Sequence, residues 1–258
     1  MNNRTKGLRL LGLLLCFPLG VLAQAGQLVS SARKVEVGKG DTVVEVSKTT
    51  ARTVINPFVA PLFGEQAKST DHIAWEVRFL SECDQNFNNR TEASQFFSTR
   101  AWEYLTEGQL DTASYRFNLA WLLDDKNSDS YWGLGVICYQ QGNNAESIRL
   151  LKKGLEVADT NAVLMTDLAT VELKQYRENK DNELLEDAIQ VLTKALKYDM
   201  TNPNTFMRLS WANYAKGDYA AAWDNLHKAR LLELSAVDLP YLQELLEKAP
   251  DPKGFFKR

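Results

Sequence analysis

The sequence predicts an all-α fold in which antiparallel helix pairs stack into a solenoid. Three observations carry this prediction. Residues 203–235 read as two short amphipathic helices joined by a tight turn at Gly217 and Asp218. Weaker copies of this segment recur upstream at a nearly constant spacing. Small residues also recur where two antiparallel helices would have to touch.

The copies repeat every 34 residues, with one departure. Alignment on Gly217 gives Gly108 and Gly142 as the turn glycines of earlier copies, 34 residues apart. An aromatic or long apolar residue opens each first helix, with spacings of 34, 34 and 41: Phe97, Tyr131, Met165 and Phe206. The columns of the second helices are spaced by 34, 41 and 34. Seven extra residues are therefore expected within the third copy, between its two helices, around 176–186.

Columns of small residues indicate how the paired helices pack. They are Ala101, Gly135, Ala169 and Ser210 in the first helices, and Ala113, Ser147, Ala188 and Ala222 in the second helices. Two helices approach closely only where side chains are small, and bulky columns then fill the space beside them. One pair cannot bury its apolar face alone, so the copies must stack. The predicted copies are 94–127, 128–161, 162–202 and 203–235.

This pattern resembles the tetratricopeptide repeat family, whose period is 34 residues. The last copy carries the family's columns most fully: Phe206, Leu209, Ser210, Gly217, Asp218, Tyr219, Ala222, Leu226 and Ala229. The resemblance covers about 94–235 and implies a right-handed superhelical solenoid of four repeats. Arg100 departs from it, since leucine stands there in the later copies, and Tyr176 replaces the turn glycine of the third copy. The proline that usually ends the second helix is absent from all four copies.

Helices are also predicted on both sides of the repeats, within a helical domain spanning 69–258. Ser69 or Thr70 can cap a preceding helix over 70–87. Asp238 can cap a last helix over 238–248, which would cover the open face of the last repeat. The basic tail after it, 253–258, is expected to hang free.

The first 25 residues have the pattern of a signal peptide. Three basic residues precede an apolar run over 10–22, and Ala-Gln-Ala follows at 23–25. A run of about 13 apolar residues is too short to span a bilayer. We therefore expect an exported chain, periplasmic or extracellular, rather than an uncleaved anchor. A lipoprotein attached through Cys16 is disfavoured, because Leu15 stands where such sites have a small residue.

Residues 26–68 are predicted to be an extended or flexible segment. Within it, 34–46 alternates valine with polar residues, which fits either a small hairpin or a flexible leader. The apolar stretch 54–63 is interrupted by two prolines, so it should be extended, and its large side chains should pack on something. The residues expected to dock on the chain itself are Ile55, Phe58, Leu62 and Phe63.

Charge and motifs argue against several classes of function. After removal of the signal peptide the chain has 27 basic and 33 acidic residues, a net charge of −6 with no basic cluster, which disfavours nucleic acid as a partner. Cys83 and Cys138 are expected to be buried free thiols rather than the two partners of a single disulfide bridge. No catalytic triad, metal-ligand spacing or phosphate loop is present, so no catalytic residue, metal or cofactor is predicted. Residues 125–136 begin like a calcium loop but lack its glycine and final glutamate.

The resemblance implies a concave groove, lined by the first helices, that holds peptides. The residues that face it by their place in the repeat are Trp102, Trp132, Val136, Tyr139, Thr170, Met207, Trp211 and Tyr214. Aromatic side chains are enriched where binding energy is concentrated. A grip on a carboxyl terminus is not expected, because lysine and asparagine are missing from these positions.

Two functions stay open at this point. One is a non-catalytic scaffold or adaptor that binds a peptide or protein segment in the groove. The other is a structural component of an envelope complex that self-associates through its repeats, with the groove filled by its own N-terminal segment. Residues 26–68 carry a net charge of +2 and residues 69–258 a net charge of −8, which favours such self-docking.

Overall fold

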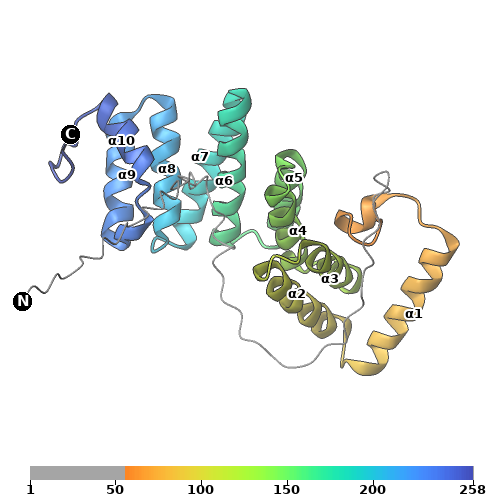
Figure 1. The fold of residues 1–258 in the computed structure, drawn as a ribbon. Coiled ribbons are helices and arrows are strands. Elements are labelled where there is room, and N and C mark those ends of the chain that lie inside the picture. Colours follow the sequence, from red (N-terminus) through yellow and green to blue (C-terminus); the bar gives the residue numbers. More distant parts are fainter. Residues whose placement is uncertain (1–55, 258) are drawn as a thin grey trace, which may run out of the picture.

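The structure, a computed structural model, describes residues 56–257. The predicted signal peptide, the hairpin or leader at 34–46 and Ile55 lie outside the described residues. Residues 56–257 form ten α-helices and two short 3-10 helices, and this part of the chain contains no strand (Figure 1). The 3-10 helices are η2 (Pro61–Glu65) and η3 (Leu234–Ala236). The α-helices are α1 (Thr70–Asn86), α2 (Arg90–Thr106), α3 (Leu110–Leu123), α4 (Ser128–Gln140), α5 (Asn144–Val157), α6 (Ala162–Asn179), α7 (Asn182–Tyr198), α8 (Pro203–Lys216), α9 (Tyr219–Leu232) and α10 (Leu239–Lys248).

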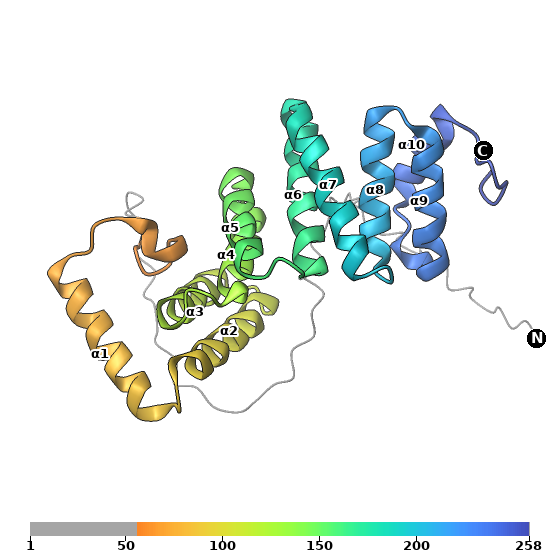
Figure 2. The same cartoon turned by 180° about the vertical axis from the view of Figure 1, so that it is seen from behind.

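The helices pack as successive antiparallel pairs, α2 with α3, α4 with α5, α6 with α7 and α8 with α9. Each pair also contacts the next one along the chain. In both views the helices from α6 to α9 stand side by side, whereas α2 and α3 lie crosswise at the other end (Figures 1 and 2). The fold is therefore an all-α solenoid of the tetratricopeptide type, as predicted.

Short polar residues start almost every helix. Side chains at the N-cap position accept a hydrogen bond from a backbone N–H of the first turn in nine of the ten α-helices of residues 56–257, α3 being the exception. Such a cap contributes about 1 kcal/mol to helix stability. The capping residues are Ser69, Asn89, Asn127, Asn143, Asn161, Asp181, Asn202, Asp218 and Asp238.

Left-handed residues reverse the chain within each pair. Gly108, Gly142 and Gly217 have φ angles of 77°, 81° and 82°, a conformation that glycine adopts without steric cost. In the third pair Lys180 takes this role with φ 58°. The seven extra residues of this pair do not form a longer loop. They lengthen the helices instead: α6 has 18 residues and α7 has 17, whereas α8 and α9 have 14 each.

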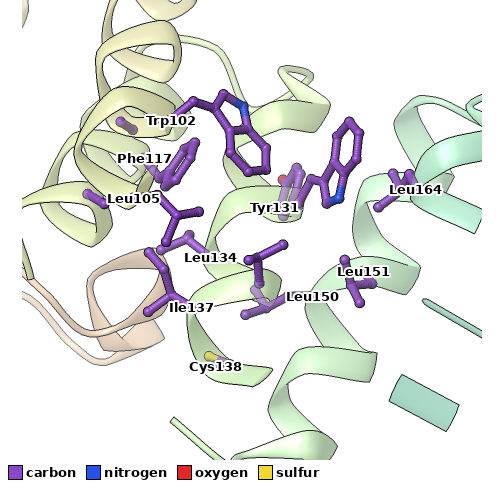
Figure 3. Close-up of a cluster of buried hydrophobic side chains, with 14 of the residues drawn as sticks. Trp102, Leu105, Phe117, Tyr131, Leu134, Ile137, Cys138, Leu150, Leu151 and Leu164 are labelled. Carbon is purple, nitrogen blue, oxygen red and sulfur yellow. The ribbon is translucent and has the colours of Figure 1, made fainter. Parts of the chain in front are cut away.

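Glycines in α4 allow close packing both against the first pair and within the second pair. A Cβ atom on Gly133 would lie 2.0 Å from Cζ of Phe117, and one on Gly135 would lie 2.8 Å from Cγ of Leu151. Phe117 and Leu151 are fully buried. Together with Trp102, they belong to the apolar cluster that joins these pairs (Figure 3).

Helix α1 buries only part of its apolar surface. Cys83 is buried, but Ile73 and Val77 are 50% and 63% exposed. The inward face instead carries Trp75 and Phe79, whose rings stack with centroids 5.7 Å apart. The reason is that α1 contacts aromatic side chains of residues 56–63 as well as α2, and these lie on one flank of the helix. The N-terminal end of α1 lies apart from the helix pairs (Figures 1 and 2).

The C-terminal segment is held to the fold rather than hanging free. The carboxylate of Asp251 accepts hydrogen bonds from the backbone N–H of Lys253 at 2.8 Å and of Phe256 at 2.9 Å. The same carboxylate lies 2.8 Å from Nε2 of the buried His227. The Phe256 ring stacks on Trp223, with centroids 6.3 Å apart.

Both cysteines of the described residues are free and buried, as predicted. Burial raises the pKa of Cys83 to about 11 and that of Cys138 to about 12. Among residues 56–257, no helix is long and apolar enough to cross a membrane. No group of three or more His, Cys, Asp or Glu side chains in the same part of the chain could hold a metal ion.

Candidate functional site

Five of the eight predicted groove residues are buried. The exposed fractions are 3% for Trp102, 5% for Trp132, 0% for Val136, 4% for Thr170 and 5% for Met207. Trp102 packs edge-on against Phe117 and Trp132, with ring centroids 5.1 and 5.3 Å away. The indole N–H of Trp132 donates to Oδ2 of Asp167 at 2.8 Å. The expectation that both tryptophans face a partner is therefore wrong, because neighbouring helices cover them.

One hollow, called here the concave pocket, is lined by four of the predicted residues: Tyr139, Thr170, Met207 and Trp211. It measures about 240 Å³ and is formed by α4, α6, α8 and α10. Tyr139 and Trp211 are half-buried at its wall. The full lining is Tyr139, Thr170, Leu173, Lys174, Arg177, Glu178, Met207, Arg208, Trp211, Asp238 and Tyr241.

Tyr214 does not line the concave pocket. Its ring packs against Tyr219 and Tyr241, with centroids 5.7 and 5.6 Å away. Tyr241 comes from α10, so the capping helix contributes to the pocket as well as closing the last repeat. Its hydroxyl lies 2.8 Å from Oγ of Ser210. Burial raises the pKa of Tyr241, which keeps this phenol neutral and able to donate a hydrogen bond.

Three basic side chains define the pocket, and the sequence reasoning missed them. The guanidinium carbon of Arg177 lies 3.9 Å from the centre of the Trp211 ring. Nζ of Lys174 lies 4.6 Å from the centre of the Tyr139 ring. Nε of Arg208 donates to Oγ1 of Thr170 at 3.1 Å. A cation over an aromatic face is held there by the ring's electric quadrupole.

The lengthened helix α6 builds one wall of the concave pocket. When α6 is aligned with α8 from their first residues, the four residues 176–179 extend beyond the end of α8. Arg177 belongs to this extension, as does Tyr176, whose ring lies 6.2 Å from that of Trp211. The insertion found in the sequence could therefore have pointed to these side chains, had it been read as extra helix rather than as a loop.

The concave pocket is locally positive on an acidic array. Its lining holds Lys174, Arg177 and Arg208 against Glu178 and Asp238, a net charge of +1, whereas residues 69–258 have a net charge of −8. Burial lowers the pKa of Arg208, and burial also lowers that of Arg177. Because arginine ordinarily titrates above pH 12, both side chains stay cationic at neutral pH. The pocket thus presents positive charge beside aromatic faces, with Arg177 exposed and Arg208 half-buried, which suits an anionic group attached to an apolar one.

The N-terminal segment docks elsewhere on the solenoid. Oδ1 of Asn118 in α3 accepts from the backbone N–H of Leu62 at 2.9 Å. Its Nδ2 donates to the carbonyls of Phe58 and Ala60 at 2.9 and 2.8 Å. Glu65 forms ion pairs with Arg149 and Lys153 of α5. The described part of the segment therefore covers second helices of the pairs and not the concave pocket.

The same segment is a left-handed turn, which corrects the expected extended conformation. Leu62, Phe63 and Gly64 have φ angles of 52°, 56° and 78°. Leu62 and Phe63 are 2% and 4% exposed, so the turn inserts both side chains into the core. Phe58 is half-buried, and its ring centre lies 4.9 Å from that of Trp75. Hydrogen bonds to Asn118 hold a conformation that non-glycine residues rarely adopt.

Solved structures share the fold. Over 66% of this chain and 79% of the other, the protein aligns with a structure from a functional characterization of Pseudomonas aeruginosa PilF, at 19% identity and a TM-score of 0.51. It also aligns with the crystal structure of MamA protein over 65% of this chain and 97% of that chain, at 16% identity and a TM-score of 0.48. No protein-family model matches the sequence, and no curated protein matches it. At such identity the likeness to the first structure supports the solenoid fold alone.

Proposed function

We propose that the chain is a non-catalytic scaffold that holds a segment of another protein in the concave pocket. The observation that carries this proposal is the convergence of Lys174, Arg177 and Arg208 with the rings of Tyr139 and Trp211 in one hollow of the solenoid. A solenoid offers an extended surface that suits partner proteins. The volume of about 240 Å³ is below the usual range for small-molecule sites, so it fits one or two side chains of a longer guest.

The guest we expect carries a carboxylate next to an apolar or aromatic side chain. A carboxylate can accept hydrogen bonds from the guanidinium groups of Arg177 and Arg208, which recognise planar anions well. The neighbouring apolar group can pack on Trp211 and Tyr139. From the sequence, a grip on a carboxyl terminus was not expected, because the predicted groove positions hold residues such as Trp132 and Val136 in place of lysine and asparagine. Both are buried, and cations occupy the pocket instead.

Export is a separate part of the proposal and rests on the sequence of residues 1–25. A cleaved signal peptide would place the scaffold in the periplasm or outside the cell, where its partner would also be found. Determination of the N-terminal residue of the protein isolated from the envelope or medium tests this. Cleavage after Ala25 is the expected result, and an intact Met1 in the exported protein would contradict it.

Capture of partners with matched variants tests the binding site. The wild-type chain, a Lys174→Gln/Arg177→Gln double variant and a Lys126→Gln control would each be immobilised and exposed to an envelope extract. Lys126 lies between α3 and α4, outside the pocket lining. We expect proteins captured by the wild type and the control to be lost from the double variant. Capture of the same proteins in the same amounts by all three chains would refute the proposed site.

Synthetic peptides test the chemistry of the guest. A peptide carrying an aspartate beside a phenylalanine is compared with the same peptide carrying asparagine in place of the aspartate. The acidic peptide should bind more tightly, and the difference should disappear in the double variant. Fluorescence anisotropy of a labelled peptide measures both affinities. Equal affinity for the two peptides would show that the pocket does not recognise a carboxylate.

A further inference from the structure

A second hollow lies at the opposite end of the solenoid from α10 and is not used by the proposed function. It measures about 470 Å³ and lies between α1, residues 56–59 and the start of α3. This volume falls within the usual range of ligand pockets. Four half-buried rings line it, and we call it the aromatic pocket: Phe58, Trp75, Tyr104 and Tyr115.

The charges of Asp111 and Arg116 in the lining of the aromatic pocket balance, and the carboxylate of Glu107 beside it adds a negative charge. Asp111 lines it and is exposed. Gln109, another lining residue, donates from Nε2 to the exposed carboxylate of Glu107 at 2.9 Å. Arg116 is the basic residue of the lining, and its guanidinium carbon lies 5.5 Å from the centre of the Phe97 ring. The pocket therefore suits an apolar or aromatic side chain that is flanked by basic residues.

The C-terminal segment of the chain has this chemistry. Phe255 is 60% exposed, although its ring centre lies 5.6 Å from that of His227 and 4.1 Å from the guanidinium carbon of Arg230. Its neighbour Phe256 stacks against the chain's own Trp223 and His227. Three basic residues flank the two phenylalanines in the sequence: Lys253, Lys257 and Arg258. We call residues 251–257 the aromatic hook.

The aromatic hook is preformed. Gly254 turns the backbone with φ 69°, and its N–H donates to the carbonyl of Asp251 at 3.1 Å. The Asp251 carboxylate accepts from two further backbone N–H groups of the hook. Burial and these hydrogen bonds act in opposite directions on the pKa of Asp251, which is lowered in balance. The ionised carboxylate of Asp251 thus fixes the backbone conformation of the hook, in which the Phe255 side chain is exposed. Docking of this ring therefore requires little further ordering of the backbone.

The two features lie at opposite ends of the molecule, with α1 at one end and the C-terminal segment at the other (Figures 1 and 2). The hook of a chain therefore does not reach its own aromatic pocket. We propose that Phe255 of one copy enters the aromatic pocket of a second copy, so that the chains associate head to tail. Such a heterologous contact leaves one free hook and one free pocket in every dimer, and it closes into a ring or continues as a filament.

Sedimentation velocity of the purified chain at increasing concentration tests the proposal. The wild type should associate, and the association should weaken at high salt because the carboxylate of Glu107 beside the pocket attracts the basic residues of the hook. Phe255→Ser should weaken the association at least about tenfold, the loss typical of a binding hot spot. The control is Leu239→Ser, which removes a side chain that is 70% exposed near the same end. Association that survives Phe255→Ser unchanged, or a wild type that stays monomeric throughout, would overturn the proposal.

A mixing experiment separates this contact from any symmetric dimer. Asp111→Lys and Thr112→Arg alter the mouth of the aromatic pocket, and Asp111→Lys changes an exposed side chain, so the fold should be retained. A pocket variant alone and Phe255→Ser alone should both be monomeric. Mixed together they should form dimers only, because one chain supplies a hook and the other supplies a pocket. Absence of mixed dimers, with each variant folded by circular dichroism, would also overturn the proposal.

Discussion

Glu172 is a buried carboxylate whose ionisation should weaken the fold. It lies on α6 and is 1% exposed. Nζ of Lys152 from α5 lies 3.2 Å from Oε1, and the same Nζ lies 3.0 Å from Oδ2 of Asp187 on α7. Neither oxygen of Glu172 accepts a well-aligned hydrogen bond. Burial raises the pKa of Glu172 to about 7, which Lys152 only partly offsets. The corresponding residues of the other pairs are uncharged: Tyr104, Cys138 and Asn213.

The size of the effect follows from the difference between folded and unfolded pKa values. In the unfolded chain Glu172 has its ordinary pKa of 4.5, against about 7 in the folded chain. Between these values the folded state binds more protons, so the free energy of unfolding falls as the pH rises through this window. Each pKa unit corresponds to about 1.4 kcal/mol, which gives a loss of at most about 3 kcal/mol above neutral pH. Lys152 is 46% exposed and regains hydration when the pair breaks, so it adds little.

The perturbation is Glu172→Gln, which resembles the protonated acid in shape and charge. We expect the variant to match the wild type near pH 4, below both pKa values, and to be more stable by up to about 3 kcal/mol near pH 8. Urea unfolding followed by circular dichroism at several pH values measures this, with the denaturant slope checked for constancy. The control is Glu156→Gln, an exposed carboxylate on α5, which should change little at any pH.

A loss of stability in Glu172→Gln near pH 8 would contradict this expectation. It would mean that the ion pair with Lys152 outweighs the burial of the carboxylate. A pH dependence identical to that of the wild type would refute it equally, since Glu172 would then have the same pKa in both states.

Three further perturbations test the packing. Gly133→Ala should lower the free energy of unfolding by about 1–3 kcal/mol, because its Cβ would collide with Phe117, and urea unfolding measures the loss. Asn118→Ala should cost about 3 kcal/mol by removing three hydrogen bonds to residues 58–62, whereas Asn225→Ala, whose amide donates within its own helix, should cost less in the same assay. The Cys138 thiol, with its pKa raised to about 12 by burial, should react with a colorimetric thiol reagent only in denaturant, and rapid labelling of the native chain would contradict its burial.

The repeat columns could be predicted because they report local and nearest-neighbour packing. Ala101 and Ala113 must be small for two helices of one pair to touch, and both are fully buried. The turn glycines follow from a backbone conformation that few other residues adopt. Both constraints act within one repeat, so their period is visible in a single sequence.

The groove residues could not be placed in the same way. Trp102 is adjacent to Ala101, and helical periodicity alone does not decide whether the flank it occupies faces solvent or the next pair. The exposure of this flank depends on how each helix pair is rotated relative to the next. In this structure the rotation brings the Trp132 ring to 5.3 Å from the Trp102 ring, centroid to centroid, and both rings are covered. Similarly, the turn at Leu62 depends on Asn118, and the hook at Asp251 depends on His227, and neither partner is near in the sequence.

The length of the insertion in the third pair indicates how residues can be inserted into or deleted from such helix arrays. Seven residues make about two turns of α-helix. Divided between α6 and α7, they add about one turn to each, so both helices keep the same faces toward their neighbours and the next pair begins undisturbed. Whole turns can therefore be added or removed at the end of a pair where its two helices are connected, without changing the residues that pack on the neighbouring pairs. In this chain the added end carries Arg177, and trimming one turn from each helix would remove that side chain while leaving four stacked pairs.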